Sequence, residues 1–208
     1  MSPVNPLADA PLLHWLHPAP ERLTAWLAEA GFELTFGTPV PTLRLSPALI
    51  EIRATTDARD ERLALVGFAP AAPPANRRHE HPNGINGVVA IGLAPVDAER
   101  AIAELGSAQF QAAQPDASLG ARAWQGPPAR PQLIMLEPLS EGRLAAALAR
   151  HGEGVVALYL GSSRPPAAGL AQALDRPRPW PGGAAARLVI RPARPWGPFL
   201  FVVEDAGG

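Results

Sequence analysis

The sequence contains no cysteine. Disulfide bonds, thiolate nucleophiles and cysteine-ligated metals are therefore excluded, and we expect a cytoplasmic protein. Lysine is also absent, so all 18 basic residues are arginine and no lysine can form a Schiff base with a substrate. No apolar run approaches the roughly 20 residues that span a bilayer. The N-terminus lacks the basic and apolar regions of a signal peptide, so we expect no membrane partner.

Apolar residues make up 47% of the 208-residue chain, and its formal net charge is -1. This composition supports a proper hydrophobic core and argues against disorder and against a polyanionic partner such as nucleic acid. The chain has 26 proline and 19 glycine residues, and its wide use of alanine and arginine is typical of a GC-rich bacterial genome.

A strand, a helix and a meander of strands are predicted for residues 11–69. Leu23, Trp26 and Leu27 recur at helical spacing before Gly31, which can take the left-handed conformation that ends a helix. The first strand is predicted at 12–17, and further strands at 32–36, 42–45, 49–53 and 63–68. Alternation along 49–53 places Glu51 on the same face as Leu49 and Arg53.

The proline- and alanine-rich residues 70–84 predict a linker. A second strand-helix-meander unit follows over 85–139, with its helix at 97–105 and later strands at 110–113, 121–124 and 132–136. Residues 140–205 predict a linking helix, capped by Ser140, and a third, shorter βαββ unit. Its strands are expected at 155–160, 186–190 and 199–203, and its helix at 165–174.

These units predict an α+β fold of repeated βαβββ modules. One helix cannot cover both faces of such a module, so two modules side by side curl their sheets into a cupped half-barrel. Three modules leave one without a partner, and either the chain pairs them in another way or a homodimer supplies the counterpart. A pair of ferredoxin-like α/β sandwiches uses the same first elements, and the number of strands between helices separates the two folds.

Several segments carry a resemblance. His14 lies in an opening strand, 43–45 and 48–52 are similar to paired strands that end in a leucine-glutamate-leucine segment, and His81-Pro82-Asn83-Gly84 forms a histidine-proline-asparagine-glycine element. Residues 150–154 and 198–201 carry the same resemblance. Over nearly its whole length the chain resembles the glyoxalase-like proteins of the vicinal oxygen chelate superfamily.

The resemblance implies a divalent metal held by His or Glu from the first and last strands of each module. Carried over by position, the metal ligands are His14, Glu51 and Glu137, while the fourth position holds Val89 and Ala90. The implied activity is that of a lyase, isomerase or dioxygenase acting on a small oxygenated molecule, with Glu51 or Glu137 as the catalytic proton carrier. We expect both carboxylates to open onto one concave pocket, with His14 or His81 within reach.

Each candidate also has a structural interpretation. His14 can be a core histidine, Glu51 a surface partner of Arg53, and His81 part of a turn rather than a ligand-binding residue. Trp124 and Trp196 can stack on a small-molecule ligand or pack in the core. The alternative function is a metal-free module that binds or sequesters a small, antibiotic-like molecule without catalysis, and five tryptophans favour it.

Overall fold

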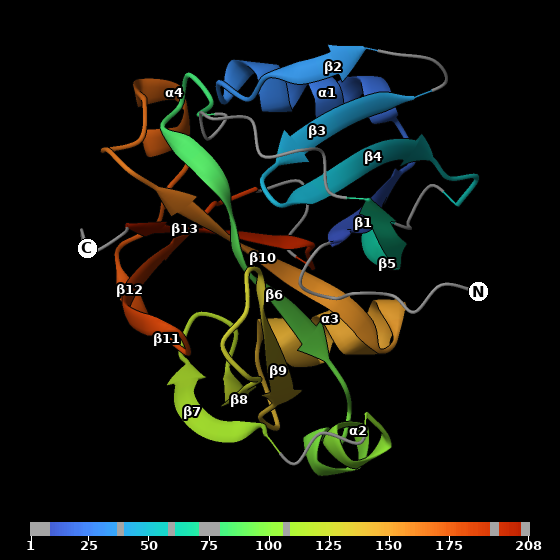
Figure 1. The fold of residues 1–208 in the computed structure, drawn as a ribbon, viewed down its shortest axis with the longest axis vertical. Helices are drawn as coiled ribbons and strands as arrows, with labels where there is room; N and C mark the ends of the chain where they lie inside the picture. Colours follow the sequence, from blue (N-terminus) through green and yellow to red (C-terminus); the bar gives the residue numbers. More distant parts are fainter. Residues whose placement is uncertain are drawn as a thin grey trace.

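The computed structural model describes residues 9–36, 40–57, 61–70, 80–105, 109–191 and 196–204. In these residues the chain forms an α+β fold with a five-stranded and an eight-stranded sheet and four helices (Figure 1). The helices of the described residues are short, and none has the length and apolarity that crossing a membrane requires.

The five-stranded sheet comes from the first unit alone. It contains β1 (Asp9–His17), β2 (Leu34–Phe36), β3 (Pro41–Leu45), β4 (Ala48–Ala54) and β5 (Arg62–Pro70), in the order β2-β3-β4-β1-β5. The helix α1 (Pro20–Glu29) connects β1 to β2 and buries Leu23 and Leu27, as predicted. Gly31 follows it with a φ of +79°, which confirms the predicted helix end.

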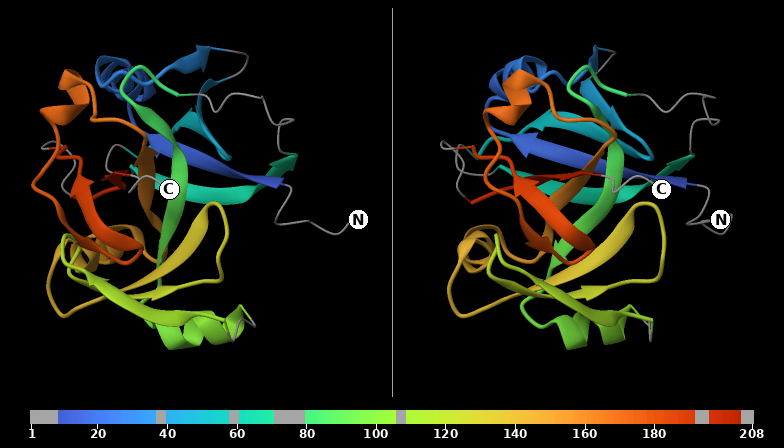
Figure 2. Two further views of the ribbon diagram at one scale, coloured as in Figure 1. Left: turned by 60° about the vertical axis from the view of Figure 1, so that its left-hand side comes forward. Right: turned by 90° about the vertical axis from the view of Figure 1, so that its left-hand side faces the viewer.

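The eight-stranded sheet joins the second and third units. It contains β6 (Ile85–Ala94), β7 (Gln111–Asp116), β8 (Ala121–Gln125), β9 (Gln132–Pro138), β10 (Gly154–Ser162), β11 (Arg178–Trp180), β12 (Gly183–Leu188) and β13 (Phe199–Glu204). The order is β11-β12-β13-β10-β6-β9-β8-β7. The sheet is curved and nearly closed (Figure 2). Gln125 of β8, the strand next to one end of the order, donates a 2.7 Å hydrogen bond to the carbonyl of Pro181, which follows β11 at the other end.

The second and third units pair within the chain. Their first strands, β6 and β10, lie antiparallel at the centre of the eight-stranded sheet, and each is parallel to the last strand of its own unit. In the first unit, β1 is parallel to β4 on one side and antiparallel to β5 on the other. The strand β5 therefore takes the place beside β1 that β10 takes beside β6, and the pairing of modules does not need a second chain.

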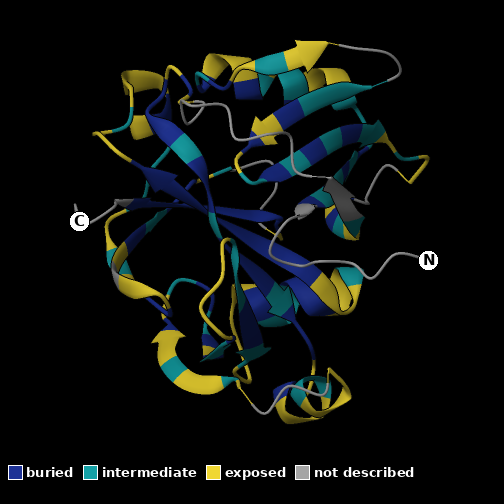
Figure 3. Ribbon diagram, viewed as in Figure 1, coloured by how far each residue is buried: buried dark blue, intermediate teal, exposed yellow. Residues whose placement is uncertain are grey.

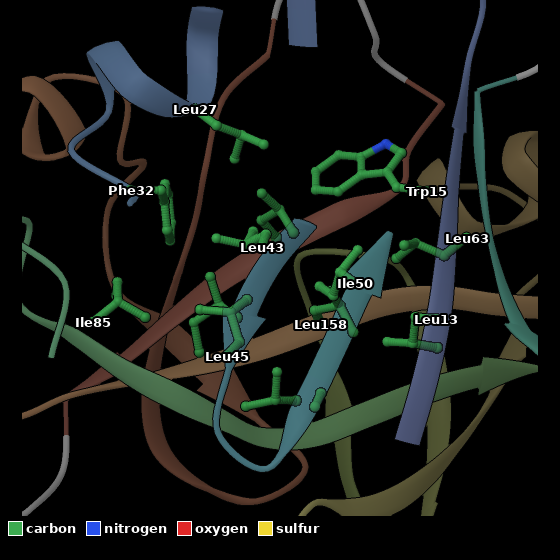
Figure 4. Packing of buried hydrophobic residues seen from close by; sticks show 14 of the residues in the cluster. Leu13, Trp15, Leu27, Phe32, Leu43, Leu45, Ile50, Leu63, Ile85 and Leu158 are labelled. Carbon is green, nitrogen blue, oxygen red and sulfur yellow. The ribbon is translucent and has the colours of Figure 1, made fainter. Parts of the chain in front are cut away.

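One apolar cluster lies between the two sheets. Leu13, Trp15 and Ile50 from the five-stranded sheet pack in it with Ile85 and Leu158 from the other sheet (Figure 4). The strands at this contact are largely buried along their length (Figure 3). A second cluster fills the interior of the curved sheet and includes residues of α3 (Arg143–His151), the helix that links the second unit to the third.

The third unit differs from the prediction. It is a full βαβββ module, because β11 forms in a segment where proline alternates with other residues. Proline removes a ladder donor, which an edge strand such as β11 tolerates. The helix α4 (Ala168–Ala171) is shorter than the predicted 165–174, and the N-cap of α3 is Gly142 rather than Ser140.

The second unit follows the prediction closely. Asp97 caps α2 (Ala98–Glu104) and accepts a 2.9 Å hydrogen bond from the Arg100 N–H. Most of the predicted linker, residues 71–79, lies outside the described residues. At its end Pro82, Asn83 and Gly84 form the predicted turn.

Candidate functional site

His14 and Glu51 lie beside each other on β1 and β4. The parallel register pairs the two residues, and His14 Nε2 is 3.2 Å from Glu51 Oε2. Because Leu13 and Trp15 face α1, alternation directs His14 and Glu51 to the opposite face of the sheet. The same Glu51 oxygen accepts hydrogen bonds of 2.9 and 2.7 Å from Arg53, so this carboxylate is already shared with a guanidinium group.

Glu137 lies in the other sheet, at the end of β9. Its Oε2 accepts a 3.0 Å hydrogen bond from the Ala98 N–H, and its Oε1 pairs with Arg122. A carboxylate at the first turn of a helix is stabilised by the free N–H groups and the helix dipole. Glu137 therefore holds the start of α2 against β9.

The structure does not bring the three predicted metal ligands together. Among the described residues no three His, Cys, Asp or Glu side chains converge as a metal site requires. The physical reason is the pairing of the units: the second unit pairs with the third, so β4 and β9 belong to different sheets. The expectation that Glu51 and Glu137 open onto one concave pocket is wrong. Zinc sites take three or four protein ligands, and His14 with Glu51 supplies only two, so these described residues do not fit a zinc site.

His81 is buried in the junction between the first and second units. Its Nδ1 accepts a 3.0 Å hydrogen bond from the Glu33 N–H, and its Nε2 lies 2.9 Å from the Arg44 carbonyl oxygen. Asn83 is also fully buried and donates a 2.9 Å hydrogen bond to the Ala30 carbonyl at the end of α1. The histidine-proline-asparagine-glycine element thus connects α1 and β3 to the start of β6.

Aromatic side chains fill the interior of the curved sheet. The Tyr159 ring stacks on Trp180 and Phe201, with centroid distances of 4.6 and 4.8 Å. Leu144 and Ala147 of α3 pack in the same cluster. The space that two paired modules enclose is therefore occupied by the chain itself.

Two titratable groups lie in this interior. The Tyr159 hydroxyl donates a 2.8 Å hydrogen bond to Asp116 Oδ2, and the other Asp116 oxygen accepts from the N–H groups of Ser118 and Leu119. Burial raises the pKa of Asp116, and these hydrogen bonds oppose the shift. Burial, and then the nearby Asp116 charge, raise the pKa of Tyr159 well above its ordinary value.

Trp124 lies on β8, two residues from Arg122, whose guanidinium carbon is 5.9 Å from the centroid of its ring. Alternation places Trp124 and Arg122 on the face opposite Ala121 and Ala123, which pack in the interior. The structure thus places Trp124 on the face of β8 that does not line the filled interior.

A cavity of about 320 Å³ lies where β5 meets the end of α3 and the start of β10. Its apolar wall includes Leu63, Leu65 and Val155. Trp196, with 44% of its surface exposed, also lines it. Cavities of this size with apolar and aromatic walls are typical of small-molecule sites.

Glu61 forms part of the cavity lining and is almost completely buried. Its Oε1 accepts hydrogen bonds of 3.0 Å from the Trp15 indole and 2.6 Å from Arg191, and its Oε2 lies 3.5 Å from His17 Nε2. The Arg191 guanidinium also lies 5.0 Å from the centroid of the Trp26 ring. These neighbours hold the Glu61 carboxylate in place in the cavity lining.

Polar groups at the end of α3 form the other side of the cavity. His151, Gly152 and Glu153 line it. Glu153 accepts a 2.7 Å hydrogen bond from the Val96 N–H and one of 2.9 Å from Arg100. The same cavity is therefore lined by Trp196, the predicted stacking candidate, and by the segment 150–154 that fits the family resemblance.

No family model matches the chain, and no curated protein matches it. Among solved structures, a methylmalonyl-CoA epimerase from Mycobacterium tuberculosis aligns with a TM-score of 0.48 and 20% identity, over 61% of this chain and 92% of that one. A Mn(II)-bound glyoxalase from Novosphingobium aromaticivorans aligns with a TM-score of 0.35 and 12% identity, over 94% and 63%. A catechol 2,3-dioxygenase aligns with a TM-score of 0.34 and 13% identity, over 95% and 69%.

Each of these alignments has a TM-score below 0.5 and at most 20% sequence identity, so none carries a conclusion about this chain. Paired βαβββ modules on one curved sheet are the architecture of the vicinal oxygen chelate fold, and the described residues have this architecture. The repeated βαβββ modules and curved sheet confirm the fold class predicted from the sequence. Within this fold, sequence reasoning missed Glu61, because a single acidic residue before a strand gives no local signal of a cavity.

Proposed function

We propose that this chain with the vicinal oxygen chelate fold is a small-molecule binding protein without a metal centre. The ligand occupies the cavity between β5, α3 and β10. The observation that carries the proposal is the filled interior of the curved sheet, where Tyr159, Trp180 and Phe201 stack on one another. The open volume lies instead between the first unit and the paired units.

The donor geometry favours this function over a metal-dependent enzyme. Glu51 is shared between His14 and Arg53, and Glu137 is held by Arg122 and the start of α2. Binding a metal at either carboxylate would first have to break these contacts. The cavity needs no such rearrangement, because its apolar wall and Trp196 already surround an open volume.

Isothermal titration with indole, a neutral bicyclic probe, tests the binding proposal. We expect one site per chain, and we expect Trp196→Ala to weaken binding about tenfold, because an aromatic contact contributes about 0.5–1.5 kcal/mol beyond its buried area. Phe36→Ala is the matched control, since Phe36 is 74% exposed on β2 and is not part of the cavity lining. Binding that is absent, or equally weakened by both variants, would refute the proposal.

Metal dependence is tested on the same protein by thermal unfolding. A metal that binds only the folded state raises the midpoint by mass action. We expect the same midpoint for the purified protein, for the EDTA-treated protein and after addition of MnCl₂. A clear drop on chelation that MnCl₂ reverses would instead support the metal-dependent enzyme, and His14→Ala would then locate the site.

A further inference from the structure

The cavity between β5, α3 and β10 is lined mainly by apolar side chains. Leu63 and Leu65 come from β5, Leu93 from β6 and Val155 from β10, and Trp196 adds a partly exposed indole ring. Removing apolar surface from water is favourable, and planar rings stack well on an indole. This surface therefore attracts the ring of a ligand, and the response to a charge on the ligand depends on the charged side chains of the lining.

The buried carboxylate of the lining is neutralised within the protein. Glu61 is 2% exposed and accepts hydrogen bonds from the Trp15 indole and from Arg191. The Arg191 guanidinium carbon lies 5.3 Å from the centroid of the Trp15 ring and 5.0 Å from that of the Trp26 ring. A ligand cation could pair with Glu61 only by displacing an arginine that these contacts hold, and breaking a buried ion pair is costly.

The second carboxylate of the lining is also paired. Glu153 accepts hydrogen bonds of 2.9 Å from Arg100 and 2.7 Å from the Val96 N–H. Its side chain is 44% exposed, and Arg100 is not part of the cavity lining. The charge of Glu153 is therefore balanced from outside the cavity, and a cationic ligand would have to compete with Arg100 for it.

The basic residues of the lining offer no free positive charge to an anion. Arg62 lies at the start of β5 and His151 at the end of α3, and both already interact with other groups of the protein. Each charged side chain of the described lining thus has a partner. A charged ligand of either sign would lose part of its hydration in the cavity without gaining a free opposite charge, and this loss weakens binding.

We infer that this cavity binds uncharged planar aromatic molecules in preference to cations and anions with the same ring system. The inference rests on the proposed binding function and adds the chemical class of the ligand. The ring stacks on Trp196 and covers the apolar surface of β5 and β10. The ion pairs of Glu61 and Glu153 remain intact when an uncharged ligand binds.

Three probes with the same two fused rings test this preference. At pH 7 quinoline is neutral, 1-methylquinolinium is a cation and quinoline-2-carboxylate is an anion. We expect titration calorimetry to show quinoline binding about tenfold more tightly than either charged probe, because only the charged probes lose hydration that the cavity does not replace. The preference should persist in added salt, since it does not come from attraction between exposed charges.

Removing one counter-charge should change the preference in a defined direction. Arg100→Met leaves the Glu153 carboxylate without its arginine, and we expect 1-methylquinolinium to gain about threefold in affinity relative to quinoline, as for a partly exposed ion pair. Adding Glu153→Gln to this variant removes the carboxylate charge as well and should restore the wild-type ratio. The control is Arg22→Met on α1, an exposed residue that is not part of the lining, which should leave the ratio unchanged.

The outcomes separate this inference from the binding proposal. If either charged probe binds as tightly as quinoline, the ligand class is overturned, while binding of indole still supports the proposed function. A ratio that Arg100→Met changes no more than Arg22→Met does, or that Glu153→Gln fails to restore, also overturns the inference. If neither indole nor quinoline binds the folded protein, both proposals fall.

Discussion

Removing the Tyr159 hydroxyl tests how much the hydrogen bond between Tyr159 and Asp116 stabilises the interior of the curved sheet. The hydroxyl donates to Asp116 at 2.8 Å, and both side chains are almost completely buried. A hydrogen bond to a charged group contributes about 1.5–3 kcal/mol, and phenylalanine keeps the ring that stacks on Trp180 and Phe201. We therefore expect Tyr159→Phe to lower the free energy of unfolding by about 2 kcal/mol at pH 7.

The effect depends on pH in a definite direction. Burial raises the pKa of Asp116 in the folded state, so the folded protein binds the proton more tightly, and this group's contribution to stability increases as pH falls. The hydrogen bond from Tyr159 opposes the shift, and its loss raises the pKa of Asp116 further. The variant then gains a proton at a higher pH than the wild type, and the difference in unfolding free energy narrows on acidification.

Urea unfolding at pH 7 and pH 4 measures both quantities. The control is a double-mutant cycle with Asp116→Asn, in which removal of the hydroxyl should cost less than it does beside the carboxylate. A loss below about 0.5 kcal/mol at pH 7, where a typical hydrogen bond already contributes that much, would contradict the reasoning. A difference in unfolding free energy between variant and wild type that widens at pH 4 would also contradict it.

Three further predictions follow from burial. Tyr159 is the single tyrosine of the sequence, and its raised pKa means that absorbance at 295 nm should show no ionisation near pH 10 until the protein unfolds. Leu27→Ala should lower the unfolding free energy by about 2–5 kcal/mol in chemical denaturation, because Leu27 is fully buried. Ile102→Ala should lower it by less, because Ile102 is only half-buried, and equal losses would contradict this expectation. Asn83→Ala should lower the unfolding free energy by about 2–3 kcal/mol, since it leaves the buried partners of the amide unsatisfied; a thermal midpoint close to that of the wild type would argue against it.

Most of the strands and longer helices could be predicted from local pattern. The helix α1 follows from its leucine spacing and from Gly31, and α2 from its Asp97 cap, because these signals act within a few residues. The strand β11 could not be predicted, since Pro179 within it and the flanking Pro177 and Pro181 argue against a strand, and only its edge position permits one.

The site was less predictable because it depends on which units pair. Glu51 and Glu137 occupy related places in their own units, and a sequence cannot show that these units lie in different sheets. The cavity is assembled from residues near 61, 151 and 196, which are far apart along the chain. The sequence indicates Trp196 as a stacking candidate and residues 150–154 as part of the resemblance, but their proximity comes from tertiary packing.

The apolar cluster between the two sheets determines how the chain opens. Leu13 and Ile50 on one side share it with Ile85 and Leu158 on the other. The first unit cannot separate without exposing the outer face of the central strands β6 and β10, so we expect β1 and β10 to open together. Amide protons in β1 and β10 should therefore exchange with solvent at similarly slow rates, and added denaturant should accelerate both with one common slope.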